Sequence, residues 1–257
     1  MSHPHPFSTT AFEGKRALIT GAAGGIGHAC ARVLAVGGAD LLLTDLDQIR
    51  LDKLAGEISA TAGRPVTVET FSGDLTRPDT RADLIALVAE AGGIDLLIPA
   101  AGIYPESPFQ KISDEDWETV LSVNMTAVFT LTRDLSMHLR RGGAIVNFGS
   151  IAGARGSRNH SHYAATKGAI AAFTRSIAIE LADRDIRANT VAPGIIQTSM
   201  TNNLVADVGD DLLKATPLHR FGTPEDVAGI VAFLCTDTAG FITGETIHVN
   251  GGLHMAS

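Results

Sequence analysis

Short apolar runs alternate with longer stretches of helical periodicity along most of the chain. Seven of these runs hold four to six residues and are predicted to be β-strands, at residues 16–20, 40–44, 66–71, 94–99, 144–148, 187–191 and 246–249. Apolar positions at helical spacing predict helices near residues 26–37, 47–62, 78–91, 114–139, 163–183 and 224–235. Strands that are apolar almost throughout are typical of a parallel sheet covered on both faces. The pattern therefore predicts an α/β fold, a doubly wound parallel sheet of seven strands with right-handed crossovers and helices on both faces.

The alternation continues without a break that would separate two domains. The 257 residues suffice for one large core, and no linker rich in Pro, Gly or Ser interrupts them. We therefore expect a single domain over residues 14–257, preceded by a flexible tail over residues 1–13. Residues 195–219 break the rhythm by mixing polar and apolar positions, and this stretch is a candidate mobile lid.

The composition argues against several classes of partner. The net charge of −8 gives no attraction for nucleic acid or an anionic membrane, and no apolar run approaches the roughly 20 residues of a membrane span. The N-terminus has neither the basic nor the apolar region of a signal peptide. Cys30 and Cys235 each lie in an apolar helical stretch, so free buried thiols in a reducing cytoplasm are expected. No metal site is predicted.

A glycine-rich turn, Thr20-Gly21-Ala22-Ala23-Gly24-Gly25-Ile26-Gly27, follows the first predicted strand and opens the first predicted helix. Gly21 permits the tight turn, while Gly25 and Gly27 let the backbone approach a pyrophosphate and let the helix pack closely on the sheet. The helix begins near Ile26 and offers free N–H groups and the positive end of its dipole to phosphates. The alternative is an ordinary glycine-rich loop.

Asp45, at the end of the second predicted strand, lies about 20 residues past the glycines, where dinucleotide-binding folds place an acidic residue. A carboxylate there accepts hydrogen bonds from the adenosine ribose and repels a 2′-phosphate. Neither Leu46 nor residues 22–24 include a Lys or Arg that would receive such a phosphate, so NAD is favoured over NADP. Alternatively, Asp45 caps the next helix, a task that Asp47 could also perform. Asp74-Leu75, past the third strand, is a candidate contact for the adenine edge.

Tyr163 and Lys167 lie four residues apart on one face of a predicted helix. A tyrosine with an ordinary pKa of about 10 is a poor base, and a nearby ammonium is expected to lower that pKa. Tyr163 would then exchange a proton with a carbonyl or alcohol oxygen. Ser150, at the end of the fifth strand, would donate a hydrogen bond to the same oxygen. Asn124 would hold a water that links Lys167 to solvent.

In this order the residues resemble the short-chain dehydrogenase/reductase family, in its branch of about 250 residues. The resemblance covers Lys15 to Gly252 and implies a Rossmann-type fold with a catalytic tetrad of Asn124, Ser150, Tyr163 and Lys167. It also implies a homotetramer assembled through the helices near 114–139 and 163–183 and the last strand. The matching pieces are the glycine turn, Asp74, Asn124, Ser150, Tyr163, Lys167, Pro193-Gly194, Thr198 and Val249-Asn250-Gly251-Gly252.

The resemblance further implies which residues bind the nicotinamide cofactor. Thr198 would hold the nicotinamide carboxamide with the Ile196 backbone near it, and Lys167 would hold the ribose. Together with the residues derived above, the expected cofactor site comprises Gly21, Gly25, Ile26, Gly27, Asp45, Asp74, Leu75, Ala101, Gly102, Tyr163, Lys167, Pro193, Gly194, Ile196 and Thr198.

The chain departs from the family pattern after the fourth strand, where the family usually has Asn-Asn-Ala-Gly. Here the residues are Pro99-Ala100-Ala101-Gly102. Because proline lacks an N–H, we expect the strand to end one residue early. The missing side-chain hydrogen bonds would cost about 1 kcal/mol each and weaken local rigidity. The backbone at Ala101 and Gly102 could still meet the ribose.

The substrate is less well specified than the chemistry. Candidate substrate contacts are Tyr104, Ala152, Asn159 and Ile195. The loop before Tyr163 is polar, which favours a hydroxylated substrate such as a polyol, sugar or cyclic alcohol. Alternatively, its polar side chains face solvent or a subunit contact. They are Arg155, Asn159, His160 and His162, the last of which is expected to face away from Tyr163.

Two rival functions remain open. The first is a 3-oxoacyl-(acyl-carrier-protein) reductase that uses NADPH, with Arg140, Arg141 and Arg184 as a basic patch for the acidic carrier. Solvated helix ends explain these arginines equally well, and Asp45 argues against NADPH. The second is a nucleotide-sensing protein without turnover, against which the tetrad argues. The favoured prediction is an NAD-dependent enzyme that oxidises a secondary alcohol or reduces its ketone.

Overall fold

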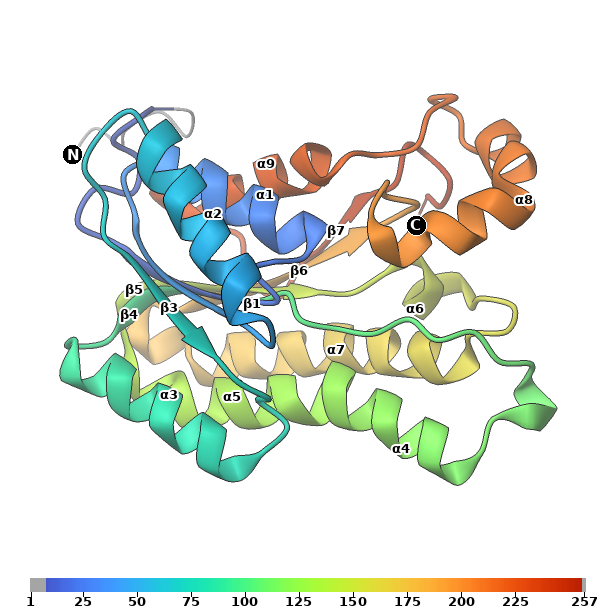
Figure 1. Cartoon of the computed structure of the whole chain (residues 1–257), viewed down its shortest axis with the longest axis horizontal. Coiled ribbons are helices and arrows are strands. Elements are labelled where there is room, and N and C mark those ends of the chain that lie inside the picture. Colours follow the sequence, from blue (N-terminus) through green and yellow to red (C-terminus); the bar gives the residue numbers. More distant parts are fainter. Residues whose placement is uncertain (1–7, 256–257) are drawn as a thin grey trace.

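The computed structural model describes residues 8–255, which form one parallel sheet between two layers of helices (Figure 1). The strands lie in the order β3-β2-β1-β4-β5-β6-β7, and every neighbouring pair is parallel. This confirms the predicted doubly wound fold. The strands are β1 (Arg16–Thr20), β2 (Asp40–Asp45), β3 (Val68–Ser72), β4 (Ile94–Pro99), β5 (Leu139–Phe148), β6 (Arg187–Pro193) and β7 (Thr246–Val249).

Helices cover both faces of the sheet (Figure 1). One layer contains α1 (Gly25–Val36), α2 (Gln48–Thr61) and α9 (Pro224–Cys235). The other contains α3 (Pro78–Glu90), α4 (Asp114–Leu121), α5 (Ala127–Leu135) and α7 (Ser161–Glu180). Single 3₁₀ turns lie at Phe109–Lys111, Ser136–His138, Ala182–Arg184, Ser199–Thr201 and Asp237–Ala239.

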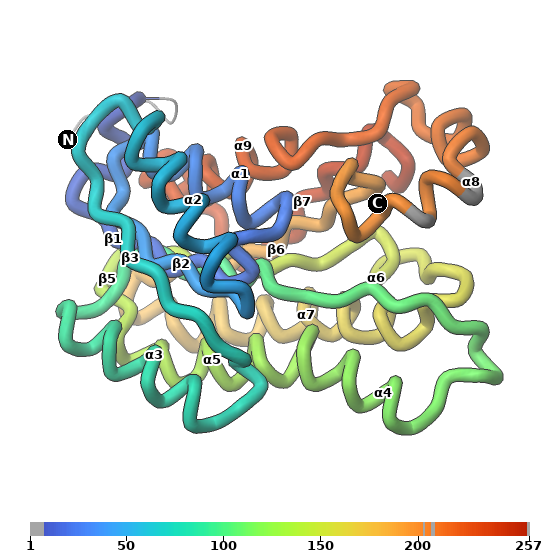
Figure 2. Tube along the Cα trace, in the orientation of Figure 1, coloured from blue at the N-terminus to red at the C-terminus, as the bar shows by residue number. Residues whose placement is uncertain are grey.

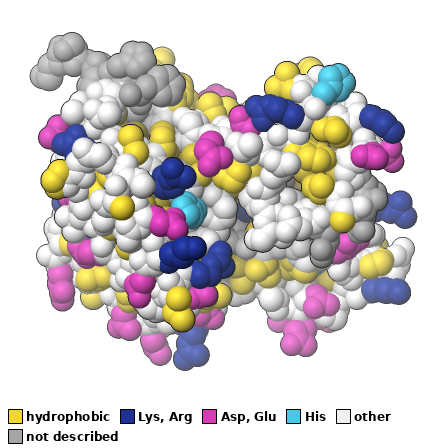
Figure 3. Space-filling view, turned by 45° about the horizontal axis from the view of Figure 1, so that its top comes forward, with side chains coloured by type: hydrophobic (Ala, Val, Ile, Leu, Met, Phe, Trp, Pro, Cys, Tyr) yellow, Lys and Arg dark blue, Asp and Glu magenta, His cyan; other side chains and the backbone are white. Residues whose placement is uncertain are grey.

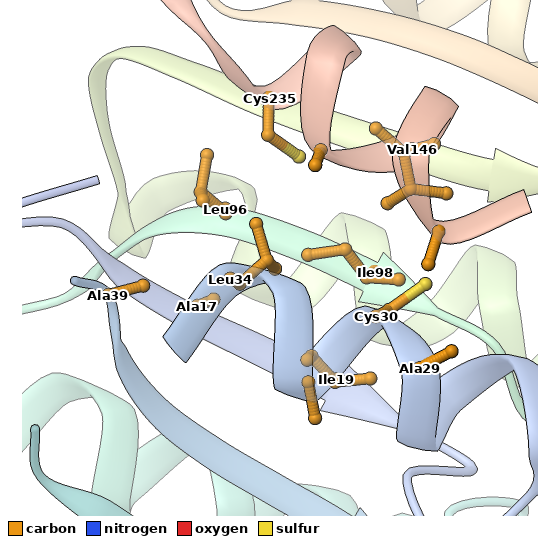
Figure 4. Packing of buried hydrophobic residues seen from close by; sticks show 14 of the residues in the cluster. Ala17, Ile19, Ala29, Cys30, Leu34, Ala39, Leu96, Ile98, Val146 and Cys235 are labelled. Carbon is orange, nitrogen blue, oxygen red and sulfur yellow. The ribbon is translucent and has the colours of Figure 1, made fainter. Parts of the chain in front are cut away.

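Two hydrophobic cores explain why the strands are apolar almost throughout. Ile19 and Ile98 point into the core beneath α1 and α9 (Figure 4), whereas their neighbours Leu18 and Leu97 point into the core on the other face. All four side chains are buried, so each central strand is covered twice. The first core also holds both cysteines, which are free, and burial raises the pKa of the Cys235 thiol to about 12.

Three helical regions differ from the sequence prediction. The long helix expected near 114–139 is α4, a π-helical turn at Ser122–Thr126 and then α5, and β5 begins at Leu139, earlier than expected. Two helices were missed, α6 (Ile151–Arg155) and α8 (Asn202–Ala215). The chain trace shows both at the end of the molecule toward which β5 and β6 run (Figure 2). Most of the candidate lid is thus helical, and its closure stays a prediction.

The expected N-terminal tail is only partly covered by the described residues, since residues 1–7 lie outside them. Residues 8–13 pack against the domain, which corrects the expectation for this part. Phe12 is 2% exposed and its N–H donates to the Gly37 carbonyl (2.8 Å). Glu13 pairs with Arg64 at 2.8 Å. Within residues 8–255, no helix is long and apolar enough to cross a membrane, and no cluster of three potential ligands could hold a metal ion.

Pro99 belongs to β4 and pairs with Thr20 of β1, so the expectation that this strand ends one residue early is wrong. The N–H of Ala100 donates to the Thr20 carbonyl (3.2 Å). Because successive residues of a strand direct their N–H groups to opposite sides, the nitrogen of Pro99 faces β5. The pairing of β4 with β5 has already ended at Leu97, so the proline costs the sheet no hydrogen bond.

We therefore predict that Pro99→Ala changes the free energy of unfolding by less than about 1 kcal/mol. Leu97→Pro, inside the paired region, should cost about 3 kcal/mol or more, because it removes a ladder hydrogen bond and a core side chain. Chemical denaturation followed by circular dichroism measures both. A stabilisation above about 2 kcal/mol by Pro99→Ala would contradict this account of the strand.

Candidate active site

Two adjoining cavities lie where the carboxyl ends of the central strands meet, the edge at which α/β sheets bind ligands. The larger has a volume of about 380 Å³ and the smaller about 110 Å³. Figure 3 shows the surface hollowed between the part that holds α1 and α2 and the part that holds α8. Residues that line both cavities, and so join them, are Ile26, Ala100, Ala101, Gly102, Thr198 and Met200.

The glycine turn forms one wall of the larger cavity through contacts that only glycine allows. Gly21 has a φ of +61°, and a Cβ there would lie 2.7 Å from the Ala101 backbone. A Cβ on Gly27 would overlap the Gly21 carbonyl, and one on Gly25 would lie 2.7 Å from the Thr198 methyl. Helix α1 begins at this wall. Its first N–H groups have no partner within the helix and are free to bind a ligand in the cavity. This bare backbone cradle fits the pyrophosphate of a dinucleotide.

Asp45 lies in the wall of the larger cavity and does not cap α2, because Asp47 does so by accepting from the Arg50 N–H (3.1 Å). The Asp45 carboxylate accepts from the N–H groups of Ala23 (3.0 Å) and Leu46 (2.8 Å). The guanidinium of Arg50 lies in the same wall and donates to the Ala23 carbonyl. Arg50 was not predicted as a site residue, because a cation was expected only at Leu46 or within residues 22–24. Its position in the first turn of α2, three residues after the cap, was the available signal.

Asp74 and Leu75 also line the larger cavity, as predicted. The Asp74 carboxylate accepts from the Thr76 hydroxyl (2.7 Å) and N–H (2.9 Å), and these bonds lower its pKa. The backbone that follows Pro99 is held despite the missing asparagines, since the Ala101 N–H donates to the Thr20 hydroxyl (3.1 Å). A side chain from β1 thus supplies a restraint to this loop.

Asn124 holds Ile103, two residues further along the same loop. It lies in the π-helical turn, where its Oδ1 accepts from the Ile103 N–H and its Nδ2 donates to the Ile103 carbonyl, both at 2.9 Å. The side chain is 1% exposed. This amide therefore positions the loop at Ile103, and the expected water between Asn124 and Lys167 stays a prediction. Single π-helical turns are frequent at functional sites.

Ser150, Tyr163 and Lys167 meet at the smaller cavity, as predicted. Ser150 caps α6 by accepting from the Ala152 N–H (3.1 Å), which leaves its own proton free to donate. The Lys167 ammonium donates to the Phe148 carbonyl (2.9 Å) at the end of β5 and lies 5.5 Å from the centre of the Tyr163 ring. The three groups that the mechanism requires are therefore assembled by α6, α7 and β5.

The pKa of Tyr163 moves in the direction opposite to the one expected from its spacing to Lys167. Desolvation by the surrounding protein raises the pKa of the phenol to about 12, and the Ser150 hydroxyl opposes that shift. Burial also lowers the pKa of Lys167 to about 8. The ammonium is directed to the Phe148 carbonyl rather than to the phenol oxygen, so burial decides the shift. Tyr163 is consequently protonated at neutral pH and suited to donate a proton.

An aromatic row borders Tyr163. Tyr104 meets its ring edge-on with centroids 4.7 Å apart and stacks on His160 at 3.9 Å. The Nδ1 atom of His160 lies 2.7 Å from the Arg158 carbonyl oxygen, which assigns the proton to Nδ1, and burial lowers the pKa of the ring. Two predicted substrate residues therefore contact catalytic side chains: Tyr104 meets the Tyr163 ring, and the Ala152 N–H donates to the Ser150 hydroxyl.

None of the four predicted substrate residues, Tyr104, Ala152, Asn159 and Ile195, lines the cavity of Ser150 and Tyr163. Asn159 donates to Glu106 (2.8 Å), and Ala152 is buried at the start of α6. Ile195 lines a separate cavity beside β7. By contrast, the predicted nicotinamide contacts Pro193, Gly194, Ile196 and Thr198 all line the smaller cavity.

Asn124→Ala should lower the free energy of unfolding by about 2–4 kcal/mol, because it leaves both backbone polar groups of Ile103 without a partner. Gln110→Ala, which removes an exposed amide, is the control and should change it by less than about 0.5 kcal/mol. Urea titration compares the two variants. If Asn124→Ala proves as neutral as the control, the amide does not hold this loop.

Comparisons with known proteins place these features in context. A family model described as enoyl-(acyl carrier protein) reductase matches residues 21–254. The chain is 38% identical to the 3-oxoacyl-(acyl-carrier-protein) reductase FabG of Thermotoga maritima, over 94% of this chain and 98% of that protein.

Solved structures resemble the whole domain. A short-chain dehydrogenase/reductase of Brucella melitensis, described as glucose/ribitol dehydrogenase, is 42% identical, with a TM-score of 0.91 over 96% of this chain and 100% of that one. A putative NAD(P)-dependent gluconate 5-dehydrogenase of Beutenbergia cavernae, with bound NADP, is 33% identical, with a TM-score of 0.90 over 97% and 99% of the two chains.

Proposed function

The chain belongs to the short-chain dehydrogenase/reductase family, and from that premise we propose that it transfers a hydride between NAD(H) and a secondary alcohol or its ketone. The observation that carries the proposal is the junction of the two cavities. The glycine turn and Asp45 line one, Ser150, Tyr163 and Lys167 line the other, and Thr198 lines both. A dinucleotide that filled the larger cavity would therefore place its nicotinamide beside the proton donor.

NAD is the cofactor that Asp45 favours, because its carboxylate accepts from ribose hydroxyls and repels a 2′-phosphate. The N-terminus of α1 would hold the pyrophosphate, Asp74 and Leu75 the adenine edge, and Thr198 with the backbone near Ile196 the nicotinamide carboxamide. When bound, the nicotinamide supplies or accepts the hydride. The protein's task is to orient it and to manage the proton.

Tyr163 manages the proton. In ketone reduction its phenol, which burial keeps protonated, donates a proton to the substrate oxygen. The Ser150 hydroxyl donates a hydrogen bond to the same oxygen and fixes its position. Lys167, positively charged at neutral pH, stabilises the phenolate that remains. Alcohol oxidation is the reverse step and needs the phenolate of Tyr163, which burial makes a minor species at neutral pH.

The substrate class that we propose is a polyol, sugar or cyclic alcohol. The smaller cavity, at about 110 Å³, suits a compact reacting group. Two structural relatives are described as glucose/ribitol dehydrogenase and gluconate 5-dehydrogenase, which agrees with the same class.

The rival function, 3-oxoacyl-(acyl-carrier-protein) reduction with NADPH, has the support of the Thermotoga relative. The three arginines expected to bind the acidic carrier already interact with other groups of this chain. Arg140 pairs with Asp95 (2.8 Å) and Arg141 with Asp185 (2.6 Å). Arg184 donates to two backbone carbonyls near the start of β5. This observation favours the alcohol dehydrogenase. A nucleotide sensor without turnover would leave the assembled catalytic groups unused.

We further propose a cytoplasmic homotetramer built from single domains over residues 14–257. Free buried thiols suit a reducing compartment. On the helices expected at the interface, Trp117 of α4 and Phe129 of α5 are each 40% exposed, and Phe129 meets Phe173 of α7 edge-on. An apolar face of this kind is typical of an assembly surface.

Tyr163→Phe should reduce turnover by about 10²–10⁴-fold, since it removes the proton donor and leaves the ring packing intact. NAD binding, followed by calorimetry, should persist. The assay follows reduced nicotinamide with NAD or NADP against polyols, cyclic alcohols, hydroxy acids and a 3-oxoacyl thioester. Near-normal turnover by Tyr163→Phe would remove the proposed acid/base, and NAD binding without reaction on any substrate would favour the sensor.

A further inference from the structure

Arg81 occupies a position on the buried face of α3 where the helical pattern calls for an apolar residue. The other buried side chains of this helix are Leu84 and Val88, one and two turns further along, and both belong to the core on that face of the sheet. Arg81 itself is 9% exposed. Charged side chains are rarely buried to this extent unless a group of opposite charge pairs with them. The arginine therefore indicates a role beyond packing.

The Arg81 guanidinium has no acidic partner in the part of the chain that the structure describes. From residue 8 to residue 255, no carboxylate lies within 4.0 Å of it, and its Nε atom is buried without a hydrogen bond. Its Nη1 atom instead donates to two backbone carbonyls, those of Leu75 (2.9 Å) and Thr76 (3.0 Å). A buried cation without a counterion is costly, so its compensation comes from these two carbonyls.

Asp74 holds the same two peptide groups from the opposite side. The Thr76 N–H donates to the Asp74 carboxylate (2.9 Å), and the Arg77 N–H donates to the Asp74 carbonyl (3.1 Å). The carbonyl and the N–H of a trans peptide point in opposite directions. Two consecutive peptides therefore lie between the Arg81 guanidinium and Asp74, with their carbonyls on the cation. Hydrogen bonds in such a chain polarise one another, so Arg81 strengthens the bond that fixes the Asp74 carboxylate.

The Asp74 side chain is held by one of its oxygens and leaves the other for a ligand. Both of its hydrogen bonds, from the N–H and from the hydroxyl of Thr76, go to Oδ1, and Oδ2 accepts none from the described residues. The bonds from Thr76 lower the pKa of Asp74, so the group is a carboxylate at neutral pH and can only accept. Asp74 lines the larger cavity. A ligand group that meets Oδ2 there must be a donor, as the exocyclic amino group of adenine is.

We propose that Arg81 is a positioning residue for the base of the dinucleotide, which holds Asp74 from behind the loop so that Oδ2 accepts a hydrogen bond from the adenine amino group. Arg81 does not line the cavity, so it acts through Asp74 rather than on the ligand. The inference rests on the proposed function, because it assigns the larger cavity to a dinucleotide. It adds a selection of the base, adenine over hypoxanthine, whose carbonyl oxygen would face the carboxylate.

Calorimetry on the full chain tests this without a substrate, with 5′-AMP and 5′-IMP as probes. The wild-type chain should prefer AMP by about tenfold or more, the effect of one hydrogen bond to a charged group. Arg81→Met removes the guanidinium and should reduce that preference to about threefold or less. Arg81→Lys should keep part of it, because it retains the charge. Val88→Ala removes a core side chain from the same face of α3 and should leave the ratio unchanged.

A double-mutant cycle separates positioning of Asp74 from a general effect on the fold. Asp74→Ala should abolish the preference for AMP, because it removes the acceptor. In that background Arg81→Met should change the ratio no further, since its effect passes through the missing carboxylate. Should Arg81→Met fail to fold, Arg81→Gln takes its place with the same expectations.

The outcomes separate the proposals. If Arg81→Met weakens AMP and IMP equally, Arg81 only stabilises the loop, and the proposal is overturned. It is likewise overturned if the variant leaves the ratio unchanged, if it still lowers the ratio in the Asp74→Ala background, or if the wild-type chain binds both probes equally. Failure of the wild-type chain to bind either probe would instead sink the assignment of the cavity to a dinucleotide, and with it the proposed function.

Discussion

The hydrogen bond from the Lys167 ammonium to the Phe148 carbonyl ties helix α7 to the carboxyl end of β5. A second bond, from Asn147 to Thr174 (2.9 Å), fixes the same helix two turns further along. Together they set the register of α7 on the sheet and place Tyr163 at the edge where β5 ends. A buried ammonium is costly unless it is paired, and its lowered pKa of about 8 records that cost. The catalytic arrangement thus follows from how one helix is fastened to one strand.

The architecture could be predicted because burial on both faces makes every central strand apolar almost throughout. The bounds of β1 and β7 agree with the prediction, β4 extends through Pro99 instead of ending one residue early, and every other strand was predicted with shifted ends. The misses have local causes. The π-helical turn at Ser122–Thr126 lies directly between two helices and was predicted as part of one long helix. Helix α6 has five residues and α8 begins in a polar stretch, so neither gave a clear pattern. Pro99 is tolerated because it lies beyond the paired part of β4 and β5, and that could not be known before the strand order.

The site residues could be predicted where their spacing along the chain indicates the chemistry. Their contacts and pKa values could not, because these depend on packing. The glycine turn, Asp45 and the residues around Tyr163 come together as expected. The direction of the Tyr163 pKa shift could not be predicted, because spacing along a helix does not reveal how far the phenol is desolvated. Asn124 was found, but its bonds to Ile103 depend on a loop distant in the sequence. Arg50 was not predicted, because its hydrogen bond to the glycine turn depends on how α2 packs beside that turn.

The central claim is that burial, rather than the nearby ammonium, controls the phenol, which therefore stays protonated as a proton donor. The chain has two tyrosines, Tyr104 and Tyr163, and burial raises the pKa of both. Phenolate absorbance, titrated in the wild-type chain and in Tyr163→Phe, isolates Tyr163 as the difference between them. The account predicts no phenolate from Tyr163 below about pH 10, the ordinary pKa of a free tyrosine. One equivalent of phenolate that appears near neutral pH in the wild type and is absent from the variant would contradict it.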